Sequence, residues 1–486
     1  MSLFFESIRA LTTKIETALD HGKISLALRS IHDFVERIVT EPICTAQAFA
    51  SRDLDELCLR IGRHALASLV VPQDNLSPGA NYGPSIVYLV SRLQRSGGHS
   101  RLIQDFIRSQ PEEYHLILST EVAGPSDHEF FSKLFATKGN VRFVRAPGGN
   151  FESRLNWLQS TLLTSQPKHV YLFNHHQDSI SVAALVPELR LKGSFCHHGD
   201  HHLCLGVHLS HLTHIDFHPM GFHHCRNELG VDNRYLPLTF EDKKCVPFES
   251  DFMQGGTLVT ATAARSNKVE IPYYVSYLDT IPRVLKATGG RHVHIGKLTP
   301  WALLRIYHQM RKQGVQKDRF VYIEWTSSVW KALQAHKVDA YIASFPYGAG
   351  LTLIEAMGAG IPLIMHEHMH SRVLSGLELA YPDAFQWSDP EDLLAYLTTL
   401  QPERLEHERA LSRQQYERYH RPERLQGYLR NAESVELQAP PLSSKYRPRY
   451  DEFAAWVEAQ LSFYRLGFRF LYRGWRRLRR LREFLR

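Results

Sequence analysis

The chain has 486 residues, of which 43% are hydrophobic and 22% charged, a composition typical of globular proteins with two or three domains. It excludes a chain that is disordered over most of its length, and no fixed period indicates a repeat protein or a coiled coil. The net charge is +7, but nine Arg and one Glu within residues 461–486 supply a net +8. The basic character therefore belongs to this segment, and a nucleic-acid-binding body is not expected.

Cysteine usage and the N-terminal segment indicate the compartment. None of the cysteines forms a C-x-x-C pair, which excludes a disulfide scaffold and favours a reducing compartment. The segment MSLFFESIRALTTKIE has no basic stretch followed by an apolar run, so no secretory signal is predicted. No run of about 18 apolar residues predicts a membrane-spanning helix. We therefore expect a cytoplasmic protein. The cysteines are Cys44, Cys58, Cys196, Cys204, Cys225 and Cys245.

Residues 1–75 are predicted to form a helical N-terminal region. Apolar residues recur at spacings of three and four from Phe4 to Leu19 and from Ile24 to Ile38, and a third helical run covers about 53–69. A loop rich in Pro, Gly and Asn follows. It marks the boundary of this region.

Residues 76–250 alternate between short apolar runs and helical patterns, which predicts a parallel sheet with helical crossovers. The expected strands are 85–90, 114–119, 141–144, 169–174, 193–197 and 214–217. The expected helices are 101–107, 151–164 and 179–189. This segment is therefore predicted to be the first of two Rossmann-like domains.

Residues 251–435 repeat the pattern. The expected strands are 258–262, 292–295, 320–323, 338–342 and 361–365. The expected helices are 272–287, 301–313, 351–358 and a charged run over 389–430. Residues 436–486 are expected to be a linker and a basic helix. We therefore predict an α/β protein in which two Rossmann-like domains face a cleft at the carboxyl ends of their strands.

The most informative motif is segment 345–362, FPYGAGLTLIEAMGAGIP. Gly348 and Gly350 precede a helix that is expected to begin at Leu351, so backbone N–H groups and the helix dipole can hold a phosphate there. Thr352 adds a hydroxyl group. Glu355, one turn into the helix, offers a carboxylate to a ribose diol.

This segment resembles the nucleotide-sugar site of glycosyltransferases with the two-domain GT-B fold. Family 4 members carry E-G-F-G-L-x-x-x-E-A-M-A-x-G-x-P at this site, so Glu355 corresponds to the second Glu and Tyr347 replaces the first. The Gly-x-Thr-x-x-acid spacing also resembles the O-GlcNAc transferase and HMW1C-like group. The resemblance covers about residues 80–430 and implies a nucleotide-sugar donor. It also implies that no metal is required, because basic groups and a helix N-terminus hold the diphosphate.

Basic residues in two neighbouring loops fit the same donor site. Segment 258–268, LVTATAARSNK, is a strand that runs into a loop with Arg265 and Lys268, and Lys297 follows the next strand. In related enzymes such a Lys or Arg neutralises the diphosphate, whose charge grows as it leaves. The predicted donor-binding residues are Arg265, Lys268, Lys297, Gly348, Gly350, Leu351, Thr352 and Glu355.

Histidines and acids follow the strands of the N-terminal domain, in the loops 97–99 (GGH), 174–178 (NHHQD), 197–201 (HHGDH) and 216–218 (DFH). Carboxyl ends of parallel strands meet at one edge of a sheet, so these loops are expected to face the second domain. The predicted catalytic residues, acting as base, acid or acceptor-binding groups, are His99, His198, Asp200 and His201. A GGHS-R loop followed by an HHxDH loop also resembles one bacterial subgroup of GT-B transferases.

A zinc site is the rival interpretation of this histidine-rich segment, because Cys196, Cys204 and Cys225 lie nearby in the sequence. However, no C-x-x-C, H-E-x-x-H or similar spacing indicates one. We therefore expect no metal ligands and no cofactor.

The segment FYRLGFRFLYRGWRRLRRLREFLR, from Phe463 onwards, is predicted to be a basic amphipathic helix. Leu471, Trp475 and Leu478 share one helical stripe, and arginines surround it. Such helices lie on anionic membrane surfaces. A helix that packs across the N-terminal domain is the alternative. We expect peripheral association with the inner face of the cell membrane.

Together these features predict a glycosyltransferase that moves a sugar from a nucleotide sugar to a glycan or lipid-linked glycan of the surface-polysaccharide type. A retaining and an inverting mechanism both stay open. The alternatives are a protein glycosyltransferase, a nucleotide-sugar epimerase or hydrolase of the same fold, a His-rich metal-binding protein, and a module that binds nucleic acid or protein through the Arg-rich tail.

Overall fold

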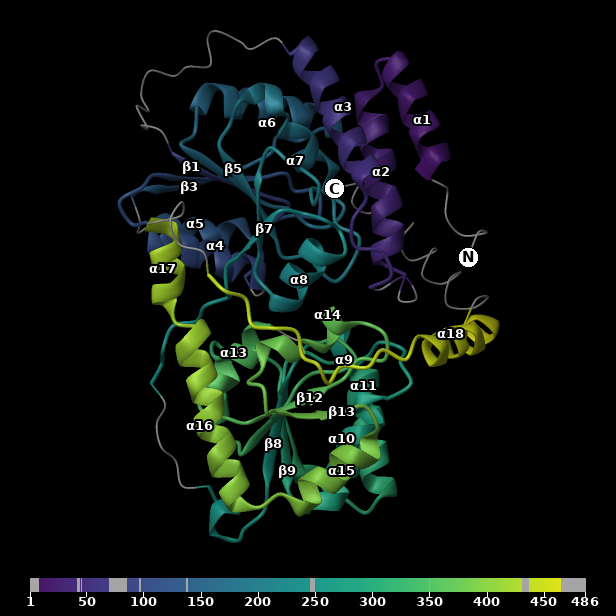
Figure 1. Ribbon diagram of the computed structural model, residues 1–486, viewed down its shortest axis with the longest axis vertical. Coiled ribbons are helices and arrows are strands. Elements are labelled where there is room, and N and C mark those ends of the chain that lie inside the picture. Colours follow the sequence, from purple (N-terminus) through teal and green to yellow (C-terminus); the bar gives the residue numbers. More distant parts are fainter. Residues whose placement is uncertain are drawn as a thin grey trace.

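The protein forms two α/β domains that lie one above the other in Figure 1. The computed structural model describes residues 8–41, 44, 46–69, 85–95, 98–136, 139–244, 250–348, 350–430 and 437–464. Each domain contains one sheet, and every strand pair in both sheets is parallel.

The first sheet has seven strands in the order β3-β2-β1-β4-β5-β6-β7. The strands are β1 Ile86–Val90, β2 His115–Ser119, β3 Val141–Arg145, β4 His169–Phe173, β5 Gly193–His197, β6 Thr213–Asp216 and β7 Asn233–Tyr235. The order reverses at β1 and β4, which is the topological switch point of a Rossmann-like sheet. The six expected strands are present, and β7 adds a short edge.

The second sheet has six strands in the order β10-β9-β8-β11-β12-β13. The strands are β8 Val259–Ala263, β9 Arg291–Ile295, β10 Phe320–Ile323, β11 Ala340–Ile342, β12 Leu363–His366 and β13 Phe385–Trp387. The two sheets thus repeat one topology, with the switch point between β8 and β11 in the second. The predicted fold class is confirmed.

The first domain contains eight α-helices among its described residues. They are α1 Ile8–Asp20, α2 Ile24–Val39, α3 Arg52–Ser68, α4 Gly98–Ser109, α5 His128–Ala136, α6 Phe151–Ser165, α7 Ser179–Ala184 and α8 Pro219–Asn227. Helices α1–α3 share a core with one face of the sheet, where Ile31 and Ile61 belong to the same buried cluster as Val87 and Leu89. The helices expected as a separate N-terminal region are therefore part of this domain's core.

The helices from residue 266 onward surround the second sheet or return to the first domain. They are α9 Ser266–Val269, α10 Tyr277–Thr288, α11 Pro300–Lys312, α12 Val329–Ala335, α13 Leu351–Gly358, α14 Arg372–Ser375, α15 Pro390–Thr399, α16 Pro402–Tyr419, α17 Pro422–Arg430 and α18 Tyr450–Tyr464. The helical run expected over 389–430 is three helices, each starting with a proline at its first position. Proline suits this position because its missing N–H has no partner within the helix.

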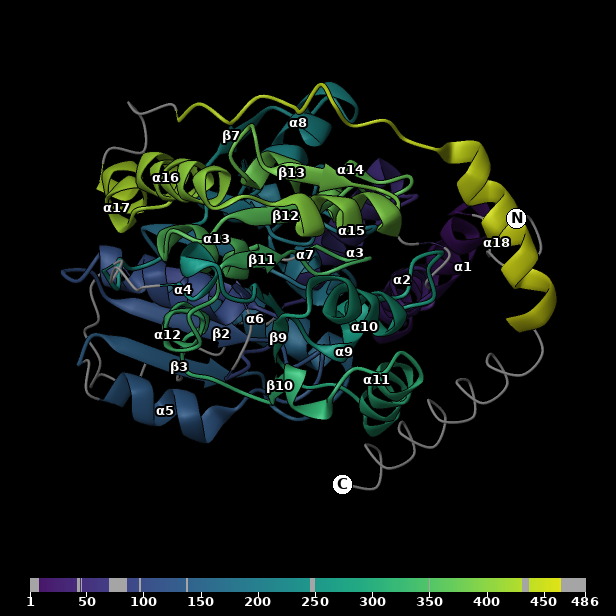
Figure 2. The same ribbon diagram turned by 90° about the horizontal axis from the view of Figure 1, so that it is seen from below.

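The chain crosses back to the first domain after the second sheet. Helix α16 packs on α13, and α17 packs on α4 of the first domain. The segment 437–449 then runs past both domains, where the Pro440 carbonyl oxygen lies 2.8 Å from Nε2 of His223 on α8 and the Tyr446 hydroxyl donates to the His368 carbonyl oxygen at 3.1 Å. Figure 2 shows this segment leading to α18. Helix α17 and the segment 437–449 therefore connect the two domains. Helix α17 lies on the first domain, although the second domain was predicted to extend to residue 435.

One sequence prediction changes at this level, and another is not tested. The helix expected over 179–189 is α7 followed by a 3-10 turn, Pro187–Leu189. The basic helix expected within 461–486 lies largely outside the described residues, which end with α18 at Tyr464. Among the described helices, none has the length and apolarity needed to cross a bilayer.

Candidate functional site

A cavity of about 2860 Å³ lies between the carboxyl ends of the two sheets. From the first domain it is lined by Gly98 at the start of α4 and by the loops after β5 and β6. From the second domain it is lined by the loops after β8 and β11 and by the start of α13. It continues along α2 toward α18. The cleft expected from the strand order is therefore present and extends well beyond the two sheets.

The glycine-containing loop before α13 forms one wall of the cavity. Gly348, Gly350, Leu351 and Thr352 line it, and α13 begins at Leu351 with no acidic residue in its first turn. The Thr352 hydroxyl accepts a hydrogen bond from the Tyr341 hydroxyl at 3.1 Å. The free N–H groups at the start of this helix and its dipole favour an anion here.

Lys268 supports the same loop from α9. Its Nζ donates to the Gly348 carbonyl oxygen at 2.6 Å, and the Tyr347 N–H donates back to the Lys268 carbonyl oxygen at 3.3 Å. Burial lowers the pKa of Lys268 to about 8, although the Asp200 carboxylate across the cavity opposes this shift. The ammonium group therefore lies beside the glycine-containing loop before α13, and it remains mostly charged at neutral pH.

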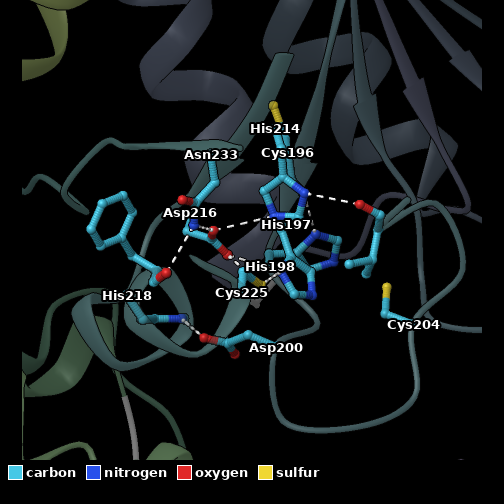
Figure 3. A network of polar contacts seen from close by, with 12 residues as sticks. Cys196, His197, His198, Asp200, Cys204, His214, Asp216, His218, Cys225 and Asn233 are labelled. Carbon is cyan, nitrogen blue, oxygen red and sulfur yellow. Dashed lines mark hydrogen bonds and ion pairs between the residues drawn. The ribbon is translucent and has the colours of Figure 1, made fainter. Parts of the chain in front are cut away.

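Asp200 and His218 form a pair on the opposite wall. Nδ1 of His218 lies 2.8 Å from Oδ2 of Asp200, as Figure 3 shows. Burial opposes both charges, but the ion pair outweighs it: the pKa of His218 is raised and that of Asp200 is held well below its usual range. A Cβ at Gly350 would lie 3.0 Å from Nε2 of His218, so this imidazole reaches the glycine loop of the second domain.

The three predicted catalytic histidines line the same wall as this pair. His201 is 38% exposed, and its Nδ1 lies 3.7 Å from Oδ1 of Asp200. His99 and His198 stack with ring centroids 4.2 Å apart. Burial and the imidazole of His175 lower the pKa of His198 to about 3, and burial and His198 lower the pKa of His99 strongly. These two rings are therefore neutral groups that can accept or donate hydrogen bonds.

Three predicted donor residues do not lie as expected. Glu355 is 7% exposed, is not part of the cavity wall, and accepts a hydrogen bond from the Trp330 N–H at 3.0 Å. It therefore faces α12 rather than a ligand. Lys297 is 73% exposed, lies outside the cavity wall and pairs with Glu324 at 3.1 Å. Arg265 is exposed and lines a small separate pocket with Arg95 instead of the cavity.

Sequence reasoning did not select His218 as a catalytic residue. The available signal was its position directly after β6, the neighbour of the strand that precedes Asp200. What could not be predicted is the approach of Nε2 to Gly350, because it depends on how the two domains meet.

Among the described residues, three groups of side chains have donor atoms close enough to hold a metal ion. One, His99, His175 and His198, lies at the cavity wall, and another, His32, Asp33 and Glu36, lies on α2. The third, His197, His214, Asp216 and Cys225, is entirely buried beneath the Asp200–His218 pair (Figure 3). Of the three cysteines considered in the sequence, only Cys225 belongs to such a group.

Comparisons with known proteins define the class of fold. No protein-family model matches the chain, and no curated sequence is significantly similar to it. Solved structures are similar: the lipopolysaccharide outer core galactosyltransferase WaaB in its apo form superposes with a TM-score of 0.53 at 13% identity, covering 72% of this chain and 99% of the other. The protein therefore has the GT-B fold, as its sequence motif predicted.

Two further similar structures are a complex with UDP and a mutant of an O-GlcNAc transferase. Anabaena Alr3699/HepE in complex with UDP superposes with a TM-score of 0.55 at 12% identity, over 72% of this chain and 99% of the other. A mutant of Thermobaculum terrenum O-GlcNAc transferase superposes with a TM-score of 0.51 at 14% identity, over 88% and 83%. At these identities the similarity establishes the fold alone.

The position of Glu355 predicts an effect on stability. Glu355→Ala removes the carboxylate that accepts a hydrogen bond from the buried backbone N–H of Trp330. An unpaired buried donor costs about 1–3 kcal/mol of unfolding free energy. Glu355→Gln is the matched control, because its amide oxygen can still accept that bond. Urea denaturation measures both. If the alanine variant is as stable as the wild type but binds nucleotides more weakly, Glu355 contributes to donor binding as the sequence predicted.

Proposed function

We propose that the protein is a glycosyltransferase that moves a sugar from a nucleotide-sugar donor to a hydroxyl of a glycan or lipid-linked glycan. The observation that carries the proposal is that one cavity has a wall from each domain, and that the two walls offer different chemical groups. An anion-binding loop with Lys268 faces the Asp200–His218 pair, and Gly350 brings the two walls to contact distance. The UDP complex of a protein with the same fold supports a nucleoside diphosphate as the donor's leaving group.

The donor diphosphate is assigned to the second domain. N–H groups at the start of α13, the Thr352 hydroxyl and the Lys268 ammonium supply donors and positive charge without a metal. His218 adds a proton donor from the opposite wall. As the bond between the anomeric carbon and the phosphate oxygen breaks, the leaving diphosphate gains charge, which these groups stabilise.

The acceptor is assigned to the first domain and to the extension of the cavity along α2. His201 is positioned to take the proton of the attacking hydroxyl, with Asp200 beside it. The neutral rings of His99 and His198 offer hydrogen bonds to acceptor hydroxyls. A volume of about 2860 Å³ exceeds the roughly 300–1000 Å³ of most small-molecule sites, which supports an acceptor larger than a monosaccharide.

The first prediction concerns pH and the donor. Because the pKa of Lys268 is about 8, its charge is present below that pH and is lost above it. Affinity for a nucleoside diphosphate should fall as pH rises through this value. Lys268→Met should weaken binding about 10–100-fold at pH 7, the loss of a charged hydrogen bond, and should flatten the pH profile.

Calorimetry with several nucleoside diphosphates, after a thermal-shift screen of nucleotide sugars, provides the measurement. Lys297→Met is the control, because Lys297 lies outside the cavity and its loss should leave affinity unchanged. If no nucleotide stabilises the protein, or if both lysine variants bind equally well, the donor site is placed wrongly.

The second prediction separates turnover from donor binding. His201→Ala should lower kcat by about 100-fold or more, the usual contribution of a general base, with donor affinity nearly unchanged. Asp200→Asn should lower kcat and also weaken donor binding, because this carboxylate helps to keep His218 and Lys268 charged. His208→Ala, in the same histidine-rich segment but outside the cavity wall, is the matched control. Product analysis without acceptor completes the test, since an epimerase or hydrolase would consume the donor alone.

The third prediction concerns the membrane. We propose that the protein works in the cytoplasm at the inner face of the cell membrane, with residues 461–486 on the anionic surface. Deleting 465–486 removes all nine arginines of this segment and its apolar stripe. Each basic residue near an anionic bilayer contributes about 1 kcal/mol, so the truncated protein should leave anionic liposomes in a sedimentation assay.

A matched variant replaces Arg473, Arg476, Arg477 and Arg480 with Gln and keeps the apolar stripe. It should bind more weakly than the wild type, and the wild type should dissociate at high salt because salt screens surface charge. A full-length protein that ignores liposomes, with a truncated form that unfolds, would show that the segment packs on the protein itself.

A further inference from the structure

The buried cluster beneath the Asp200–His218 pair gathers four side chains from three elements. His197 ends β5, His214 and Asp216 lie on β6, and Cys225 lies on α8. All four are buried, and their donor atoms lie within 4.8 Å of one another. Figure 3 shows the four side chains converging from these elements.

Three of the four separations between donor atoms lie near those of a tetrahedral metal site, and the fourth, between His197 and Asp216, is the shorter distance of a hydrogen bond. Nδ1 of His197 lies 2.9 Å from Oδ1 of Asp216 and 3.5 Å from Sγ of Cys225, and that sulfur lies 3.6 Å from the same oxygen. Nε2 of His214 lies 3.2 Å from Oδ2 of Asp216. Zinc bonds of about 2.0–2.3 Å at tetrahedral angles place nitrogen and oxygen ligands about 3.4 Å apart, and sulfur about 3.6 Å from nitrogen.

The hydrogen bonds around the cluster orient its members as ligands. Nδ1 of His214 donates to the Val207 carbonyl oxygen at 3.2 Å, which leaves Nε2 directed at the Asp216 carboxylate. This Nε2 is buried and makes no hydrogen bond to the described residues, although Oδ2 of Asp216 lies 3.2 Å away, so its ligand position is open. The Asn233 amide also donates to Oδ2 of Asp216 at 2.6 Å. Backbone and amide partners of this kind fix metal-binding side chains in place.

We propose that His197, His214, Asp216 and Cys225 bind one structural zinc ion. Two imidazole nitrogens, one thiolate and one carboxylate form a borderline donor set that suits Zn²⁺, and four protein ligands leave no open position for substrate. Binding releases the Cys225 thiol proton to solvent as the sulfur–zinc bond forms. This proposal departs from the expectation of no metal ligands, and it assigns the zinc no contact with the donor diphosphate.

The ion would fasten the acceptor wall of the cavity. His197 precedes the loop that carries Asp200, Asp216 lies two residues before His218, and Cys225 lies on the helix that His218 begins. A Cβ at Gly221, in the first turn of that helix, would lie 2.5 Å from Oδ2 of Asp200. One ion thus joins β5, β6 and α8 at the base of the Asp200–His218 pair.

The direct test is the metal content of full-length, tag-free protein, measured by elemental mass spectrometry after dialysis against a weak chelator. We expect about one zinc per chain in the wild type and less than about a tenth in Cys225→Ala. Cys204→Ala is the matched control, since both cysteines are 1% exposed and Cys204 is not in the cluster. His99→Ala should also retain the zinc, which separates this cluster from the one at the cavity wall.

Cobalt substitution tests the ligands without any mutation. Co²⁺ in the wild type should show the intense visible bands of a tetrahedral site and a sulfur-to-cobalt charge-transfer band, and the second band should persist in Cys204→Ala. Removing the metal with a strong chelator should lower the Tm, because binding to the native state stabilises it. Zinc below a tenth of an equivalent after reconstitution, a cobalt site without sulfur, or zinc lost in His99→Ala but kept in Cys225→Ala would each overturn the proposal.

Discussion

The approach of His218 to Gly350 is the contact on which the site depends, because it joins two domains that fold around separate sheets. The imidazole comes from the end of β6, and the glycine comes from the loop before α13. A Cβ at position 350 would lie 3.0 Å from Nε2 of His218 and 3.2 Å from Leu238, so a larger residue would require these side chains to move apart. Helix α17 and the segment 437–449 hold the domains at this separation. The cavity geometry is thus a property of the whole chain.

Charge in this cavity is costly, and each charged group is kept there by another. Burial alone would neutralise Lys268 and His218, and the Asp200 carboxylate opposes both changes. Removing one member would leave the other charges buried without compensation, which costs more than the pair contributes. Stability alone gives little reason to retain such a set, since well-packed apolar residues are often as stable. The proposed diphosphate donor would give a reason, because the charge of such a ligand would complete the balance.

The sequence predicted the parts of the structure that local patterns determine. Five-residue apolar strands such as Ile86–Val90 are buried throughout and were found, and Gly348, Gly350, Leu351 and Thr352 of the glycine motif lie on the cavity wall. Short elements were missed because few residues carry the signal: α12 has seven residues and β7 has three. The error at Glu355 follows from this, since its partner Trp330 lies on the helix that was missed. The exposed position of Lys297 was missed because it depends on the path of the loop after β9, which the sequence pattern does not determine.

The histidine-rich segment is explained by the two-residue period of a strand that continues past its end. Along residues 214–218, Ile215 and Phe217 point into one core, whereas His214 and Asp216 point to the opposite side. His218, next on that side, lies beyond the sheet and reaches the cavity. The same alternation therefore places His214 and Asp216 in the buried cluster and His218 at the cavity wall. The number of histidines in the segment does not distinguish these positions, but their place along the strand does. His197 and His214, within the sheet, contact Asp216, whereas His218, beyond the end of β6, lines the cavity.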